Sequence, residues 1–352
     1  MKLKTCFLLW MLWATVAVAQ VLPTYHLNIG DPAPAIKVKH WIKGTPVTAF
    51  EKEKIYVIDF WATWCVPCKI TMPHTSKLAE KYKDKATFLA IDVYEKEDVP
   101  IADIKKLVDT MGDKMNFHVG IEEGKFMSKN WLDTSGTYGI PTIFIVNDGR
   151  LDWIGHPKYL DSVLTKILNK TWSPELARIK LTDQRYLRQL NSVAIAEFLR
   201  RTDRMVVDIP GNTYKRVRTT PDSILMILDE MVKHIPTLKY YGNFASFRFS
   251  ALLETDQRRA IDFAREVLAY EQEDPSYLIF TASIEEEFDK LDMQEDIYRF
   301  GAACYQAWID ENPYPEYGNV PVKYKKMALM YRRAGDIEKA EEADRKAAGE
   351  LL

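Results

Sequence analysis

Two cysteines, Cys65 and Cys68, stand between an apolar, β-prone run and a helix pattern. The run Ile55–Phe60 suits a strand that is buried on both faces of a sheet, because it is nearly continuous in β-prone residues. The apolar spacing from Val66 to about Tyr82 predicts a helix. We therefore expect the cysteine pair to lie where a buried strand passes into a helix.

This position suits the pair for dithiol–disulfide exchange. A helix N-terminus carries partial positive charge and free N–H groups, which lower a cysteine pKa to roughly 3.5–7.5 and favour a thiolate on Cys65. Cys68, one turn further on, can release a mixed disulfide. The alternatives are a structural disulfide, a zinc site and a c-type haem site. No second cysteine or histidine pair has zinc spacing, and Lys69 stands where haem attachment needs histidine, so no metal or cofactor is expected.

Further β-prone runs and helix patterns alternate up to about residue 170. Asp148-Gly149 is a strong hairpin signal between the last two of these runs. Strands that alternate with helices and end in a hairpin predict an α/β sandwich. The predicted strands are 55–60, 87–93, 116–121, 142–146 and 150–154, and the predicted helices are 66–82, 101–111, 125–132 and 157–168.

After residue 169 amphipathic helix patterns replace most strand signals. Ser173-Pro174-Glu175 and Thr220-Pro221-Asp222 each combine an N-cap, a proline at the first helical position and an acid in the first turn. Residues 224–235 place apolar side chains on one helix face. The segment 205–218 is expected to be a loop because it contains a Pro-Gly pair. The second half is therefore predicted to be all-helical.

The last third of the chain resembles a tetratricopeptide repeat over about one unit of roughly 34 residues. A generic helical bundle is the alternative. The aromatic residues of this half are candidate anchors for a partner, or else they fill its core. They include Tyr240, Tyr241, Phe244, Phe247, Phe249, Tyr314 and Tyr317.

The N-terminus has the pattern of a secretory signal. Lys2 and Lys4 precede an apolar stretch that is short for a membrane span, and Ala17-Val18-Ala19 is a small-x-small cleavage site. An uncleaved anchor is the alternative. The pattern predicts a periplasmic or secreted protein. The expected organisation is a signal peptide over residues 1–19, an α/β domain over 20–170 and a helical domain over 171–352.

The segment Asp59–Lys69, with Pro73 one helical turn further on, resembles the thioredoxin active site. Gly139–Thr142 resembles the cis-proline loop of the same family. The chain is most similar to the TlpA/ResA branch of this family. The features that carry this likeness are the secretory signal, the sequence Trp-Ala-Thr-Trp-Cys and a long insertion before the cis-proline loop. The members of this branch are extracytoplasmic bacterial thiol–disulfide oxidoreductases. The resemblance covers about residues 28–170 and implies a thioredoxin-like sandwich there.

The resemblance also implies roles for individual residues. Cys65 corresponds to the attacking nucleophile, Cys68 to the resolving thiol and Asp59 to the buried carboxylate that manages the second cysteine's proton. A carboxyl inside an apolar strand has a raised pKa and exchanges protons near neutral pH, which agrees with that role; a solvated strand end is the alternative. Pro141 corresponds to the cis-proline. The apolar substrate-docking surface corresponds to Trp64, Pro67 and Ile140.

The expected function is reduction of protein disulfides, with an unidentified electron donor that restores the dithiol. Net oxidation or isomerisation is one alternative, and a helical partner-binding protein with an accessory redox domain is another. A net charge of -2, from 48 Lys+Arg and 50 Asp+Glu, gives no electrostatic footprint for nucleic acid. The helical half is expected to be a partner or self-association platform. Its one cysteine, Cys304, lies among small residues and suits a buried position.

Overall fold

The computed structural model describes residues 25–96, 98–137, 139–208, 213–217, 219–270, 276–311 and 319–350. The predicted signal over residues 1–19 therefore lies outside the described residues. Contacts divide the chain into two compact units, Met1–Gln189 and Leu190–Leu352. The predicted domain boundary near residue 170 stays a prediction.

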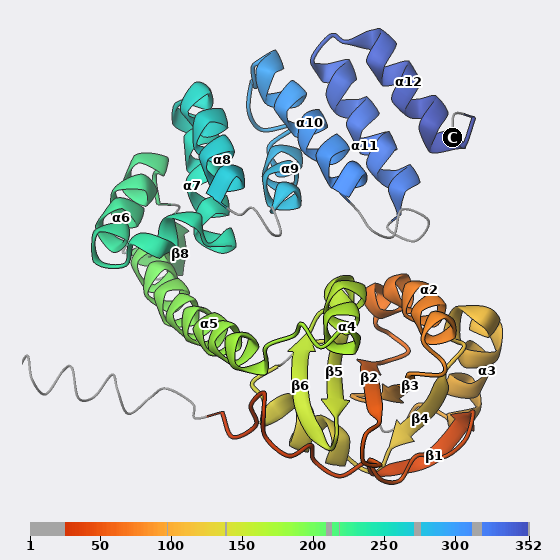
Figure 1. The fold of residues 1–352 in the computed structure, drawn as a ribbon. Helices are drawn as coiled ribbons and strands as arrows, with labels where there is room; N and C mark the ends of the chain where they lie inside the picture. Colours follow the sequence, from red (N-terminus) through yellow and green to blue (C-terminus); the bar gives the residue numbers. More distant parts are fainter. Residues whose placement is uncertain are drawn as a thin grey trace, which may run out of the picture. The chain divides into compact units, whose positions relative to one another are not determined.

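Unit 1 contains a six-stranded sheet in the order β1-β4-β3-β2-β5-β6 (Figure 1). The central strands β2, β3 and β4 run parallel, and β1, β5 and β6 are antiparallel to their neighbours. Asp148 and Gly149 both have positive φ, as a tight hairpin turn requires, and they join the last two strands. The strands are β1 (Val38–Lys43), β2 (Ile55–Trp61), β3 (Ala86–Asp92), β4 (His118–Glu122), β5 (Thr142–Asn147) and β6 (Arg150–Gly155).

Alternate residues of β2 point to two separate cores. Val57 and Trp61 lie in the core that also contains the two cysteines. This core packs against α2 (Val66–Lys81), α3 (Ile101–Met111) and α4 (Leu160–Leu168). In Figure 1 α2 and α4 lie on the same side of the sheet.

The opposite core contains Ile58 and Phe60 of β2 together with Trp131. Trp131 belongs to η2 (Ser128–Asp133), a π-helix within the predicted helix 125–132. The ring of Trp131 meets the ring of Phe144 edge-on at 5.4 Å. The predicted thioredoxin-like α/β sandwich is confirmed, with both faces of the sheet covered.

Unit 2 is largely helical, as predicted. The two predicted capping signals are confirmed, since Ser173 Oγ accepts from the Leu176 N–H and Thr220 Oγ1 accepts from the Ser223 N–H, each at 3.3 Å. α7 packs on α8, α9 on α10 and α11 on α12 (Figure 1). The helices are α5 (Pro174–Thr202), which the division between the units crosses, α6 (Pro221–His234), α7 (Gly242–Thr255), α8 (Gln257–Tyr270), α9 (Tyr277–Glu286), α10 (Glu295–Glu311), α11 (Val320–Arg333) and α12 (Ile337–Ala348).

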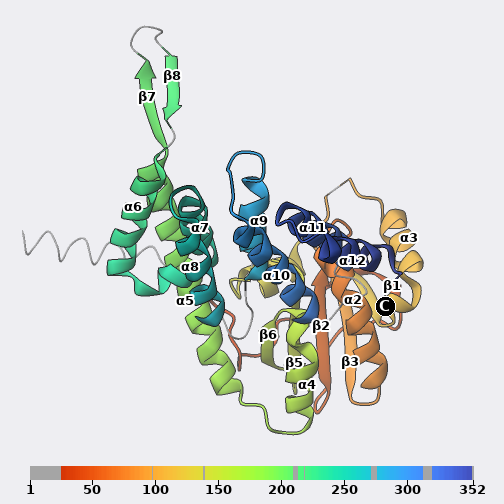
Figure 2. The same cartoon turned by 90° about the horizontal axis from the view of Figure 1, so that it is seen from above.

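The predicted loop over 205–218 is wrong. Strands β7 (Arg204–Asp208) and β8 (Thr213–Val217) pair antiparallel there and extend away from α5 and α6 (Figure 2). Valine, tyrosine and threonine favour strands, and the Pro-Gly pair falls between the two runs rather than inside one of them. The Pro-Gly pair that suggested a loop thus lies between the two strands of a hairpin in the sequence.

Several aromatic residues that were candidate anchors for a partner belong to the core of unit 2. Phe244 and Phe249 are buried, and the Phe249 ring contacts the Phe280 ring edge-on at 5.0 Å. Phe247 stacks on Phe198 with ring centroids 4.6 Å apart. Phe244 and Phe249 therefore fill the helical core, which is the second of the two alternatives stated for these aromatic residues, and Phe247 is half-buried against it. Tyr314 and Tyr317 lie outside the described residues.

None of the helices in the described part of the chain is long and apolar enough to cross a membrane.

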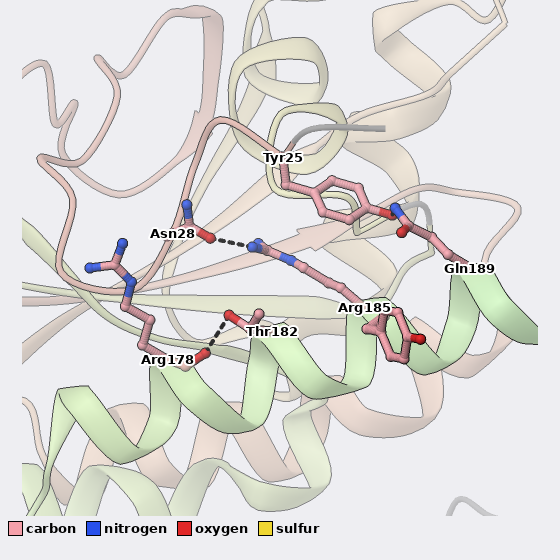
Figure 3. Close-up of a pocket in the computed structure, with 7 residues that line it drawn as sticks. Tyr25, Asn28, Arg178, Thr182, Arg185 and Gln189 are labelled. Carbon is pink, nitrogen blue, oxygen red and sulfur yellow. Dashed lines mark hydrogen bonds between the residues drawn. The ribbon is translucent and has the colours of Figure 1, made fainter. Parts of the chain in front are cut away.

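A buried arginine, Arg185, holds the N-terminal half of α5 against the N-terminal segment of unit 1 (Figure 3). The Arg185 guanidinium donates to Asn28 Oδ1 and, at 2.9 Å, to the Leu27 carbonyl, and lies 5.0 Å from the centre of the Tyr25 ring. Gln189 Nε2 donates to the Tyr25 hydroxyl at 2.9 Å. Burial lowers the pKa of Arg185 to about 10. The guanidinium therefore forms a tether between α5 and the N-terminal segment.

Replacing Arg185 by alanine should destabilise unit 1 by about 2 kcal/mol, because the Leu27 carbonyl and the Asn28 amide oxygen lose a charged donor. Urea unfolding of the full chain measures the change. Arg178→Ala is the matched control, since Arg178 is exposed on the same helix. Equal midpoints for the two variants would contradict the tether.

Candidate redox site

Cys65 caps the N-terminus of α2. Its backbone is extended, and its sulfur accepts a hydrogen bond from the Cys68 N–H at 3.1 Å. Pro67 in the first turn has no N–H to satisfy, so it suits this position. The sulfur of Cys65 therefore lies at the positive end of the helix and faces a backbone donor that favours a thiolate.

The structure holds Cys65 and Cys68 as a disulfide with Cα atoms 5.3 Å apart. The two residues are 3% and 1% exposed. The sulfur of Cys65 lies 3.7 Å from the Ile140 carbonyl oxygen. Two motifs that are far apart in the sequence thus meet at this sulfur.

The Ile140–Pro141 peptide bond is cis, as the resemblance implies. Pro141 is buried at the start of β5, and Ile140 is half-buried against the core that contains the cysteines. Thr142 Oγ1 donates to the Gly139 carbonyl at 2.7 Å and closes the loop. The cysteines and this loop therefore belong to one site.

Apolar side chains surround the disulfide on the surface. Trp64 is 55% exposed and Val66 is 59% exposed, and Pro67 is exposed as well. The Trp64 indole N–H donates to the Tyr94 carbonyl at 3.2 Å, which orients the ring. Large exposed apolar side chains beside a reactive group indicate a surface for a partner.

Asp59 is buried at 1% exposure on the face of β2 that carries Val57 and Trp61, and its register partners are Ala90 and Ile143. All four of these neighbours belong to the core that contains Cys68. Within the described residues neither carboxylate oxygen of Asp59 has a hydrogen-bond partner. Burial raises its pKa to about 8. Asp59 is therefore a buried carboxyl that exchanges its proton near neutral pH.

The sequence analysis gave no role to Asp92 or Glu95. Asp92 ends β3 at 0% exposure, and Glu95 Oε1 accepts the Thr63 N–H at 2.5 Å, two residues before Cys65. Burial and the nearby carboxylates Glu95 and Glu122 raise the pKa of Asp92 to about 9. Asp92 had the same signal as Asp59, a carboxyl inside an apolar strand run.

The surroundings of Cys304 and His118 suit a structural role rather than a reactive one. Cys304 is buried, and burial raises the pKa of its thiol to about 12. His118 Nδ1 accepts the Thr45 N–H at 2.8 Å. Among the described residues no three His, Cys, Asp or Glu side chains group as metal ligands. The dithiol is thus the reactive group that the described residues present.

The chain is similar in sequence to several known proteins. The thioredoxin family model matches residues 46–111. Protein FixW of Rhizobium leguminosarum is 33% identical over 152 residues, which are 42% of this chain and 68% of FixW. Thiol-disulfide oxidoreductase ResA of Bacillus thuringiensis is 33% identical over 131 residues, which are 36% of this chain and 68% of that protein. The solution structure of a thiol:disulfide interchange protein from Bacteroides sp. is 25% identical, covers 41% of this chain and 91% of its own, and has a TM-score of 0.34.

A thioredoxin fold with a cysteine pair at disulfide distance defines a thiol–disulfide oxidoreductase. The chain belongs to the thioredoxin family, and its relatives include proteins named ResA and FixW. The predicted likeness to the ResA branch is confirmed.

The raised pKa of Asp59 makes stability depend on pH. Between the ordinary pKa of 3.8 and the folded pKa of about 8, the folded protein keeps a proton that the unfolded chain releases. Stability therefore falls as pH rises through this window, by ~1.4 kcal/mol per pH unit for this group. Asp59→Asn should remove the contribution of Asp59 to this pH dependence, measured as the urea-unfolding free energy of the oxidised protein at several pH values.

Asp109→Asn is the control, because Asp109 is exposed on α3. The Asp109 variant should keep the wild-type slope between about pH 5 and 7. A wild-type slope in the Asp59 variant as well would mean that Asp59 is ionised throughout this range.

Proposed function

We propose that the protein reduces disulfides in other proteins through Cys65 and Cys68. The observation that carries the proposal is the position of Cys65, whose sulfur accepts the Cys68 N–H at the start of α2. A backbone donor and a helix N-terminus both stabilise negative charge on sulfur. Cys65 is therefore the nucleophile.

In the first step the Cys65 thiolate attacks one sulfur of a substrate disulfide. A bond forms between Cys65 and that sulfur, and the other substrate sulfur leaves as a thiolate that takes a proton from solvent. The apolar surface of Trp64, Pro67 and Ile140 seats the substrate chain, and Pro141 holds Ile140 next to the reacting sulfur. The product of this step is a mixed disulfide.

In the second step the ionised form of Asp59, which is in exchange with the protonated form near neutral pH, takes the proton of Cys68, and Cys68 attacks Cys65. The mixed disulfide breaks, the second substrate thiolate leaves, and the Cys65–Cys68 disulfide forms. Two electrons have then passed from the protein to the substrate, so an electron donor must restore the dithiol. The support for Asp59 is its place in the core of Cys68 and a pKa of about 8, which suits proton exchange near neutral pH.

Cys65→Ser should abolish reduction of a model substrate such as insulin, because serine is no nucleophile here. Cys68→Ser should accumulate mixed disulfides with substrate, because nothing resolves them. Turbidity of precipitating insulin and non-reducing gels measure the two effects. Cys304→Ser should behave as wild type, since that thiol is buried. Continued turnover in Cys65→Ser would overturn the assignment.

The reduction potential distinguishes reduction from oxidation or isomerisation. A disulfide reductase has a low potential, as thioredoxin does at about −270 mV, whereas a strong oxidant such as DsbA lies at about −120 mV. Equilibration of the protein with glutathione should give a value near the reductase end. A value near the oxidant end would contradict the proposed direction.

We further propose that residues 1–19 direct export to the periplasm or the exterior, and that the helical half is a platform for a partner or for self-association. The support for the platform is that the reactive residues described above belong to unit 1, whereas Cys304 of unit 2 is buried. Trapping with Cys68→Ser tests it. Full-length protein should capture substrates that residues 20–202 do not, while both reduce insulin at the same rate.

A further inference from the structure

The loop between β2 and α2 is held by the residues that follow β3. The Trp61 carbonyl accepts the Val93 N–H at 2.9 Å, and the Tyr94 carbonyl accepts the Trp64 indole N–H at 3.2 Å. Tyr94 has φ of 60°, a backbone conformation that is uncommon for a residue other than glycine. The segment after β3 is therefore shaped to reach the loop that carries Trp64 and Cys65.

One further contact in this region differs from the others because its acceptor is a carboxylate. Glu95 Oε1 accepts the Thr63 N–H at 2.5 Å. Hydrogen bonds to an ionised acceptor are shorter and stronger than those between neutral groups. Thr63 stands two residues before Cys65, and the Cys65 N–H closes a turn onto the Ala62 carbonyl at 3.0 Å. The Glu95 contact thus acts directly on the turn that presents Cys65.

Asp92 lies behind Glu95 at the end of β3. Glu95 follows Asp92 by three residues and helps to raise the pKa of Asp92, and neither oxygen of Asp92 finds a donor among the described residues. Glu95 Oε2 has no donor there either. A buried carboxyl group that has no donor and lies near other carboxylates favours its protonated form.

Glu122 of β4 is the third carboxyl group in this region, and it has its own donors. Its oxygens accept the Ser128 N–H at 2.9 Å, the Ser128 hydroxyl and the Tyr94 N–H at 3.4 Å. Asp92 has no such donors and is fully buried. Asp92 is therefore the carboxyl group of this region that keeps a proton, and a protonated Asp92 can donate a hydrogen bond toward Glu95.

We propose that Glu95 is a positioning residue for the dithiol, and that Asp92 supports it by donating a hydrogen bond from its protonated carboxyl group. Together they hold the Thr63 amide and fix the turn from which Cys65 attacks. The inference rests on the proposed function for its effect on rate. Its effect on the Cys65 thiol requires no substrate.

The test compares Glu95→Gln with Glu95→Ala in the reduced full-length protein. Both variants lose the charge, but glutamine keeps an oxygen that can accept the Thr63 N–H. The pKa of the Cys65 thiol is measured from the ultraviolet absorbance of the thiolate, and insulin reduction gives kcat/KM. Asp109→Ala, on the exposed face of α3, is the control for loss of an acidic residue.

The alanine variant should have a higher Cys65 pKa than the glutamine variant and a kcat/KM lower by roughly tenfold, the size expected when one hydrogen bond is lost. Equal Cys65 pKa values in the two variants would overturn the inference. If no variant reduces insulin but the pKa values differ as expected, the positioning role stands and the proposed function fails.

Asp92 provides a second pair of variants if Glu95→Ala does not fold. Asparagine at position 92 keeps a donor toward Glu95, whereas alanine removes it. Asp92→Ala should shift the Cys65 pKa and lower kcat/KM more than Asp92→Asn does. The same shift in both variants would also overturn the inference.

Discussion

The hydrogen bond from the Cys68 N–H to the Cys65 sulfur organises the rest of the site. It exists because β2 ends at Trp61 and the chain enters α2 within a few residues, so that Cys65 becomes the helix cap. The strands on either side of β2, parallel β3 and antiparallel β5, hold that strand and its end in place. The sheet and the helix cap thus both fix the position of the Cys65 sulfur, and Trp64 lies exposed beside it.

Two carboxyl groups are buried in unit 1 at a cost in stability. Asp59 and Asp92 have no donors among the described residues, and burial raises the pKa of both. Burying a carboxyl without a hydrogen bond is unfavourable, and such groups concentrate at functional sites. The two differ in their neighbours: Asp59 belongs to the core of Cys68, whereas Asp92 backs Glu95 and the turn before Cys65.

Local chemistry made much of the fold predictable. The run 55–60, the caps at Ser173 and Thr220 and the turn at Asp148-Gly149 each carry a signal within a few residues, and all form as expected. The hairpin over 205–218 was missed because its β-prone arms surround a Pro-Gly pair. Contacts between distant segments, such as Arg185 with Asn28 or Glu95 with Thr63, leave no local pattern, so the sequence could not predict them.

The proposed chemistry requires that Cys65 is a thiolate near neutral pH and that Cys68 is a buried thiol. Alkylation of the reduced protein with iodoacetamide across a range of pH, with the modified residue identified by mass spectrometry, tests this most directly. We expect modification at Cys65 alone, with an apparent pKa below the ordinary value of about 8.5. Modification of Cys68 first, or a Cys65 pKa at or above that value, would contradict it.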